Sequence, residues 1–287
     1  MLVFILNFLS PLPLRVLYAI SSLASLILNH VIGYRRSVID NNFKLSFPEA
    51  TEQMLLDYRN HFYLHLSDIM VETIRLKRMS RENLAKHVQF SNPDLLSRYE
   101  NGNRSVIIMM GHSGNWEWAG AATASKFNFK TIPIYRRVKE KGMNAFFYEI
   151  RSRHGSFPMR DKDASQLLAK EVAPCAVAML ADQTPGSKKG WWTTFLSQPT
   201  PFFRGSEILA RRLTNFDVLF AHVHRLERGK YEIVLQEVES DWRKNKFQLT
   251  KSFSRFLEAE IRKDPVNWLW SHKRWKHKPS ERSIFMN

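Results

Sequence analysis

The chain has 287 residues, of which 44% are apolar and 13% aromatic, with 11 glycines, 12 prolines and one cysteine. This composition excludes a disordered tail, a low-complexity fibre and a small disulfide-rich scaffold, because the chain has enough apolar surface to bury a core. Lysine and arginine number 43 against 27 aspartates and glutamates, a net charge of +16. Such an excess predicts an anionic partner: a phosphorylated substrate, an acidic carrier protein, an anionic lipid surface or nucleic acid.

The N-terminal 34 residues contain one formally charged side chain, Arg15, and residues 16–34 contain none. This uncharged stretch is just long enough to cross a membrane, and Arg35 and Arg36 follow it. We therefore predict a membrane anchor over residues 1–36 and one folded domain over residues 37–287, placed on the cytoplasmic side by the positive-inside rule. A buried helix of a soluble fold is the alternative.

A long helical pattern follows over residues 48–79. His61, His65, Asp68 and Glu72 recur along it at spacings that place them on one face. Side chains of these types can bind a metal, but polar residues at helical spacing are more typical of a solvated helix face.

Apolar runs alternate with helical patterns in the rest of the chain. The runs that predict strands cover residues 105–110, 131–135, 176–180, 218–223 and 231–238. The helical patterns cover residues 116–126, 141–153, 164–171, 205–212 and 249–263. The alternation predicts an α/β fold with a mostly parallel or mixed central sheet flanked by helices, and the last two strands are expected to form a hairpin.

The segment 111–117, Gly-His-Ser-Gly-Asn-Trp-Glu, follows the first of these strands and opens a helix, where α/β sheets carry their sites. Ser113 or Asn115 is expected to cap that helix, and Glu117 in its first turn can then approach His112. Such an imidazole can remove a proton from a substrate hydroxyl while the carboxylate fixes its tautomer. The alternative is a histidine satisfied at a strand end and a glutamate favoured by the helix dipole.

The same segment resembles the His-x4-Asp/Glu signature of the bacterial lipid A biosynthesis late acyltransferases, the lauroyl and myristoyl transferases. Other segments resemble this family in its order along almost the whole chain: Gly33-Tyr-Arg-Arg36, Asn42, Ser46-Phe-Pro48, Pro133-Ile-Tyr-Arg136, Leu180-Ala-Asp-Gln183, Pro201-Phe-Phe203 and 268–274, Trp-Leu-Trp-Ser-His-Lys-Arg. This ordered set is much more specific than the His-x4-Glu spacing alone.

The resemblance implies an inner-membrane enzyme whose acyltransferase domain, residues 37–287, has its active site on the cytoplasmic side. It implies transfer of a fatty acyl chain from acyl carrier protein, or another acyl thioester donor, to a hydroxyl of a lipid A precursor or a related anionic membrane glycolipid. We expect no cofactor, no bound metal and no nucleic-acid partner.

Residue by residue, the resemblance gives His112 and Glu117 the role of the catalytic pair. Arg136 and Asp182 match further functional positions, where binding of substrate is expected. Arg153 stands near an arginine of the family, although the spacing departs there and Arg160 competes for the role. Glu117 replaces the aspartate of many relatives, and Arg204 stands where relatives often have a small or apolar residue, a difference that concerns the acceptor.

Substrates with phosphate groups favour guanidinium and ammonium groups at the site. The candidates are Arg136, Arg137, Arg153, Lys188 and Lys189, each of which can instead be a solvated surface charge. An acyl chain needs an apolar groove, to which Trp116, Trp118, Trp191 and Trp192 can contribute unless they pack in the core.

Two further patterns have alternative interpretations. His222 and His224 share one face of a predicted strand and could bind a metal, but the sequence shows no carboxylate or cysteine partner for them. The tail 268–278 combines tryptophan with lysine, arginine and histidine, which suits a membrane interface or a nucleic-acid surface.

Two alternatives to the leading hypothesis stay open. One is an acyltransferase of the same type acting on a different lipid acceptor. The other is a basic, non-catalytic protein that binds a membrane or nucleic acid, but the sequence lacks an RNP, KH, helix-turn-helix or zinc-finger signature. A dinucleotide enzyme is disfavoured because no G-x-G-x-x-G follows a predicted strand.

Overall fold

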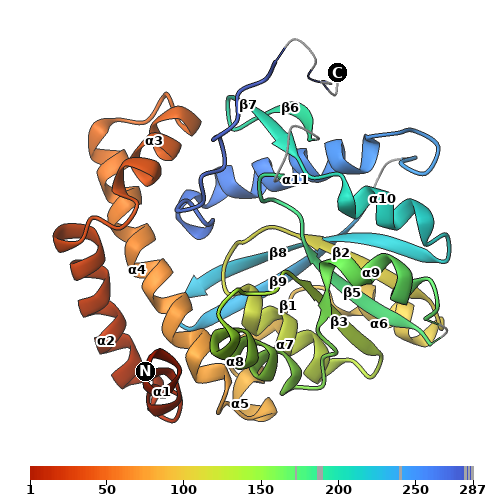
Figure 1. Cartoon of the computed structure of the whole chain (residues 1–287), viewed down its shortest axis with the longest axis horizontal. Coiled ribbons are helices and arrows are strands. Elements are labelled where there is room, and N and C mark those ends of the chain that lie inside the picture. Colours follow the sequence, from red (N-terminus) through yellow and green to blue (C-terminus); the bar gives the residue numbers. More distant parts are fainter. Residues whose placement is uncertain (172, 186–189, 239–240, 281–282, 284, 286–287) are drawn as a thin grey trace.

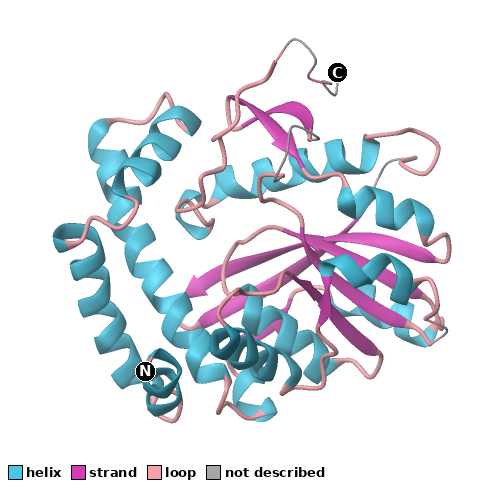
Figure 2. Cartoon of the chain, in the orientation of Figure 1, coloured by secondary structure: helices cyan, strands magenta, loops and turns pink. Residues whose placement is uncertain are grey.

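The computed structural model describes residues 1–171, 173–185, 190–238, 241–280, 283 and 285. Its centre is a seven-stranded sheet in the order β1-β9-β8-β2-β5-β3-β4, with a separate two-stranded sheet, β6-β7 (Figure 2). The strands are β1 Val88–Phe90, β2 Ser105–Met110, β3 Lys130–Tyr135, β4 Met159–Arg160, β5 Cys175–Leu180, β6 Trp191–Phe195, β7 Gln198–Phe202, β8 Phe216–Glu227 and β9 Lys230–Glu237. β2 runs parallel to both its neighbours, β8 and β5, whereas β9 runs antiparallel to β8.

The helices are α1 Leu2–Leu9, α2 Leu14–Leu26, α3 Arg36–Ser46, α4 Glu52–Leu76, α5 Arg81–Ala85, α6 Pro93–Asn101, α7 Trp116–Lys126, α8 Lys141–Ser152, α9 Asp161–Leu168, α10 Gly205–Arg212 and α11 Gln248–Lys263. A π-helical turn, Ile27–Val31, extends α2, and a 3-10 turn, Pro265–Asn267, follows α11. The predicted α/β class is therefore confirmed, including the mostly parallel sheet and the β8-β9 hairpin.

Helices cover both faces of the sheet, which explains why β2 is a continuous apolar run. Successive side chains of a strand point to opposite faces. Ile107 and Met109 of β2 accordingly pack in one core cluster with α3, α9, α10, α11 and the first half of α4. Val106 and Ile108 pack in a second cluster with α5, α6, α7 and α8.

The N-terminal segment lies beside α4 at one side of the molecule, where α2 runs along it (Figure 1). Among the described residues, one helix is long and apolar enough to cross a membrane, Leu14–Val31, and 22% of it is buried inside the protein. The inner face of α2 carries Leu17, Ser21 and Ser25, all buried. Its outer face is apolar and exposed, with Leu23 and Leu26 as examples.

Candidate active site

Two neighbouring parallel strands place the first two site residues. Met110, the last residue of β2, is in register with Leu180, the last residue of β5. His112 and Asp182 each follow two residues later, so the chain brings them to the same carboxyl edge of the sheet. This edge is where ligands bind in open α/β sheets.

Asp182 is buried and holds His112 at two points. His112 Nδ1 lies 2.6 Å from Asp182 Oδ1, and the His112 backbone N–H donates to Asp182 Oδ2 at 2.8 Å. Trp268 Nε1 donates to the same Oδ2 at 2.8 Å. Burial opposes ionisation of Asp182, but His112 and these donors outweigh it and hold the pKa of the carboxyl well below its usual range.

This arrangement selects the tautomer of the imidazole. Because an ionised Asp182 only accepts hydrogen bonds, the proton of neutral His112 must sit on Nδ1, which leaves a lone pair on Nε2. Gln183 Nε2 lies 3.2 Å from that nitrogen and can donate to it. A lone pair on an imidazole nitrogen is what a general base requires.

The narrow pocket beside His112 has no room for a water molecule, and its wall is mostly apolar. Its lining includes Phe62 and Leu66 of α4, Trp116 at the start of α7, and Trp268. The ring of Trp116 meets that of His112 edge to face, with centroids 5.0 Å apart. Of the tryptophans expected for an acyl groove, Trp116 alone lines this pocket.

The loop that carries His112 needs two glycines. A Cβ at Gly111 would stand 2.6 Å from Leu257 Cδ1 and 3.3 Å from Asp182 Oδ2. Gly114 has a left-handed φ of +57°, and a Cβ there would stand 2.5 Å from the backbone oxygen of Val223. The next residue, Asn115, caps α7 by accepting a hydrogen bond from Trp118 N at 2.9 Å, as one of the two predicted caps.

Glu117 lies in the first turn of α7, as predicted, but the structure gives its carboxylate a different partner. Arg151 of α8 donates through Nε and Nη2 to both oxygens of Glu117, at distances of 2.5 to 3.2 Å. The guanidinium also lies over the rings of Tyr135 and Phe147. The carboxylate that contacts the imidazole is that of Asp182, so the expected contact between His112 and Glu117 is replaced by two separate pairs.

Segments far apart in the sequence meet around this edge. Asn42 Nδ2 donates to the backbone oxygen of Trp270 at 2.8 Å, and Arg35 Nη1 to that of Ser271 at 2.8 Å. Thr184 Oγ1 donates to the backbone oxygen of Arg274 at 2.6 Å. The motifs at residues 33–36, 42 and 180–183 therefore all contact the segment 268–274 next to His112 and Asp182.

Residues 1–277 match the family of bacterial lipid A biosynthesis acyltransferases. The chain belongs to this family. It is therefore an acyltransferase, and its family connects it with lipid A biosynthesis. A search of the curated proteins found no match.

The arginines predicted to bind substrate in this acyltransferase do not contact His112 or Asp182. Arg136, just after β3, is exposed and pairs with Asp161 at 3.1 Å. Arg153 caps the end of α8 and is exposed, whereas Arg151, two residues earlier, reaches Glu117. Arg151 has no local sequence signal, because only the fold shows that it reaches Glu117. Lys188 and Lys189 lie outside the described residues.

The tail of the acyltransferase is not an interfacial surface at its tryptophans. Trp268 and Trp270 are buried in the core, and Arg274 is fully buried over the ring of Phe202. The expectation of a membrane or nucleic-acid surface over residues 268–278 is wrong for these side chains. The rings of Trp268 and Trp270 pack edge to face beside the site.

His222 and His224 have a carboxylate partner that the sequence did not reveal, Glu260 of α11. One ligand atom of each of the three lies within 4.8 Å of the others. His224 Nε2 already pairs with Glu260 Oε2 at 3.2 Å, and Lys263 Nζ contacts Oε1 at 2.5 Å. Lys263 thus gives the Glu260 carboxylate an ion-pair partner within the chain.

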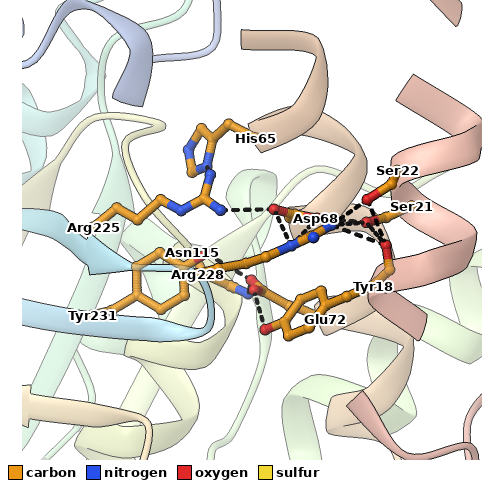
Figure 3. A network of polar contacts seen from close by, with 10 residues as sticks. All are labelled: Tyr18, Ser21, Ser22, His65, Asp68, Glu72, Asn115, Arg225, Arg228 and Tyr231. Carbon is orange, nitrogen blue, oxygen red and sulfur yellow. Dashed lines mark hydrogen bonds and ion pairs between the residues drawn. The ribbon is translucent and has the colours of Figure 1, made fainter. Parts of the chain in front are cut away.

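Of the four polar residues predicted to share one face of α4, His61 is exposed, and the other three are not solvated. His65, Asp68 and Glu72 are buried, and they contact residues of α2, the α7 start and the β8-β9 hairpin (Figure 3). Arg225 Nη2 donates to Asp68 Oδ2 at 2.7 Å, and Arg228 Nη2 to Asp68 Oδ1 at 2.6 Å. The earlier expectation failed because these partners lie about 160 residues away in sequence.

Proposed function

We propose that this acyltransferase moves a fatty acyl chain from acyl carrier protein, or another acyl thioester, to a hydroxyl of a lipid A precursor or a related anionic membrane glycolipid. The observation that carries the proposal is the contact of 2.6 Å between His112 Nδ1 and Asp182, which leaves Nε2 as the base. The family membership supports acyl transfer in general.

In the proposed reaction, His112 Nε2 takes the proton of the acceptor hydroxyl, and the oxygen attacks the thioester carbonyl carbon. The C–S bond then breaks, and the thiolate receives the proton from the imidazolium. Asp182 stabilises that imidazolium. No group outside the chain and its two substrates is needed to balance these steps.

Glu117 was expected to act beside His112, and we propose that it acts through Arg151 instead. An ion pair of this kind holds a guanidinium in one orientation, suited to an anionic group of donor or acceptor. Arg136 and Arg153, both exposed, are proposed to contact further phosphate groups. Asp182 is proposed to orient His112 rather than to bind substrate.

The N-terminal segment is compatible with membrane association, and we propose that residues 1–36 anchor the catalytic residues 37–287 at the cytoplasmic face of the inner membrane. The support is the apolar outer face formed by exposed side chains such as Phe4 and Phe8 of α1 and Leu23 of α2. Such exposed apolar area is typical of a surface that contacts lipid or protein.

A matrix of donors and acceptors tests the proposal. Purified protein in detergent is incubated with acyl carrier protein thioesters or coenzyme A thioesters, each with a lipid A precursor or a phosphoglycerolipid, and the products are identified by mass. Acylation of the lipid A precursor by the carrier protein thioester is the expected result. Acylation of the phosphoglycerolipid alone would support the alternative acceptor, and no transfer from either donor would overturn the proposal.

A further inference from the structure

Glu72 on α4 is fully buried and connects three distant parts of the chain. Tyr18 Oη of α2 donates to Glu72 Oε1 at 2.8 Å. Asn115 Nδ2 and Tyr231 Oη donate to Oε2 at 2.8 and 2.7 Å (Figure 3). Burial raises the pKa of Glu72, and these three donors oppose that rise.

One of the three parts is the start of α7, immediately after the loop of His112. Asn115 caps this helix with its side-chain oxygen while its amide nitrogen binds Glu72. Trp118 adds a second tie, because its Nε1 donates to the backbone oxygen of Glu72 at 2.9 Å. Both the side chain and the backbone oxygen of Glu72 thus bind the first turn of α7.

Another part is α2, whose inner face is held by polar contacts as well as by packing. Arg228 Nη2 donates to Ser21 Oγ at 2.7 Å and to Ser22 Oγ at 3.1 Å. The Arg228 guanidinium also lies over the ring of Tyr18, 4.5 Å from its centroid. Buried polar groups without partners cost free energy, so these hydrogen bonds favour one position of α2 against α4 and the β8-β9 hairpin.

We propose that Glu72 is a positioning residue that links α2, the N-terminal apolar helix, to the loop of His112. The position of α2 against α4 then sets the position of His112. The inference rests on the proposed role of His112 as the base. It assigns to α2 a part in catalysis beyond attachment. Displacing a catalytic group by a fraction of an ångström lowers the rate without removing any group that touches substrate.

The test compares two mild variants of α2 in the full-length protein. Tyr18→Phe removes the hydrogen bond to Glu72, whereas Ser22→Ala removes a contact with Arg228 and a hydrogen bond to the backbone oxygen of Tyr18 and leaves the contacts of Glu72 in place. We expect Tyr18→Phe to lower kcat by about tenfold with KM changed less than about twofold, and Ser22→Ala to keep the wild-type kcat. Tyr231→Phe, which removes a donor to Glu72 from the sheet side, should resemble Tyr18→Phe.

A readout independent of turnover separates this inference from the proposed function. In protein labelled with ¹⁵N-histidine, the Nδ1–H signal of His112 reports its contact with Asp182. We expect this signal to shift in Tyr18→Phe and to stay in place in Ser22→Ala. If the His112 signal stays in place in both variants, and the variants differ from wild type only in a lower unfolding temperature, the coupling is refuted even where acyl transfer is active. If it shifts but no variant or wild type transfers acyl groups, the function fails and the coupling stands.

Discussion

His112 and Asp182 stand at equal offsets from paired strand ends, each two residues beyond the register pair Met110 and Leu180. The hydrogen-bond ladder continues past the strands, since Ala181 N donates to the backbone oxygen of Met110 at 2.9 Å. The positions of both residues therefore depend on the pairing of β2 with β5. Strand pairing brings the two residues to the same edge, and the loop of His112 completes their contact of 2.6 Å.

Asp182→Asn tests the orienting carboxylate. Asparagine can occupy the same space, but its neutral amide favours the wrong imidazole tautomer and leaves the imidazolium unstabilised. We expect kcat to fall by about 10² to 10⁴ with a nearly unchanged affinity for the donor thioester. Steady-state kinetics with the donor and acceptor varied separately provides the measurement. An activity within a few-fold of wild type would show that Asp182 has no part in orienting the base.

The pair of Glu117 and Arg151 is tested by a double-mutant cycle. If Glu117 acts by holding Arg151, then Glu117→Gln, Arg151→Gln and the double variant should each lose about 10²-fold in kcat/KM. If the losses in kcat/KM of the two single variants multiply in the double variant, the two residues have separate roles. A pairing of Glu117 with His112, as expected from the sequence, requires that result. The exposed pair Arg136 and Asp161 is the matched control, for which coupling near zero is expected.

Membrane attachment is tested on the outer face of the N-terminal helices. We expect Phe4→Glu combined with Leu23→Glu to move the protein from the membrane toward the soluble fraction, because both side chains are exposed and apolar. Leu167→Glu on α9, another exposed apolar position, should leave the partition unchanged. Fractionation of cell lysates and the unfolding midpoint in detergent are measured together. Full retention of the double variant on membranes would locate attachment elsewhere on the basic surface.

Two buried histidines make stability depend on pH. Burial lowers the pKa of His65 and of His222 to about 3, against about 6.5 for an exposed imidazole. Each stays neutral in the folded protein and gains a proton on unfolding, so its contribution is complete above about pH 6.5 and is lost as the pH falls toward 3. Together they add a slope of about 3 kcal/mol per pH unit over that range.

Denaturant titrations between pH 7.5 and 4.5 measure this slope. The variant His65→Gln with His222→Gln should show a much shallower slope, and His61→Gln, at an exposed position of the same helix, should keep the wild-type slope. If the double variant fails to fold at pH 7.5, His222→Gln alone should remove about half of the effect. A wild-type slope in every variant would contradict the assignment.

The sequence predicted the elements that carry strong periodicity. The strand of residues 105–110 and the helices of residues 116–126 and 205–212 have the predicted bounds in the structure. The loop of His112 and the cap at Asn115 were also predicted, because strand-to-helix turns have local signatures. The pairing of His112 with Asp182 was not predicted, because it depends on β5 lying next to β2, which local patterns do not encode.

Partners distant in sequence account for the other differences. Asp68 and Glu72 looked like a solvated face because their cationic and hydroxyl partners come from the β8-β9 hairpin and α2. Arg151 was missed because only the orientation of α8 shows which of its arginines faces Glu117. Such contacts emerge from the tertiary fold and override local tendencies.

The most direct test of the account is the rate of a single turnover by His112→Ala. Wild type and variant are purified in the same detergent, checked for equal unfolding midpoints, and mixed in excess with an acyl carrier protein thioester and a lipid A precursor. The account predicts acylated precursor from the wild type and a rate lower by about 10² to 10⁴ in the variant. Acyl transfer by a well-folded His112→Ala protein at nearly the wild-type rate would contradict it.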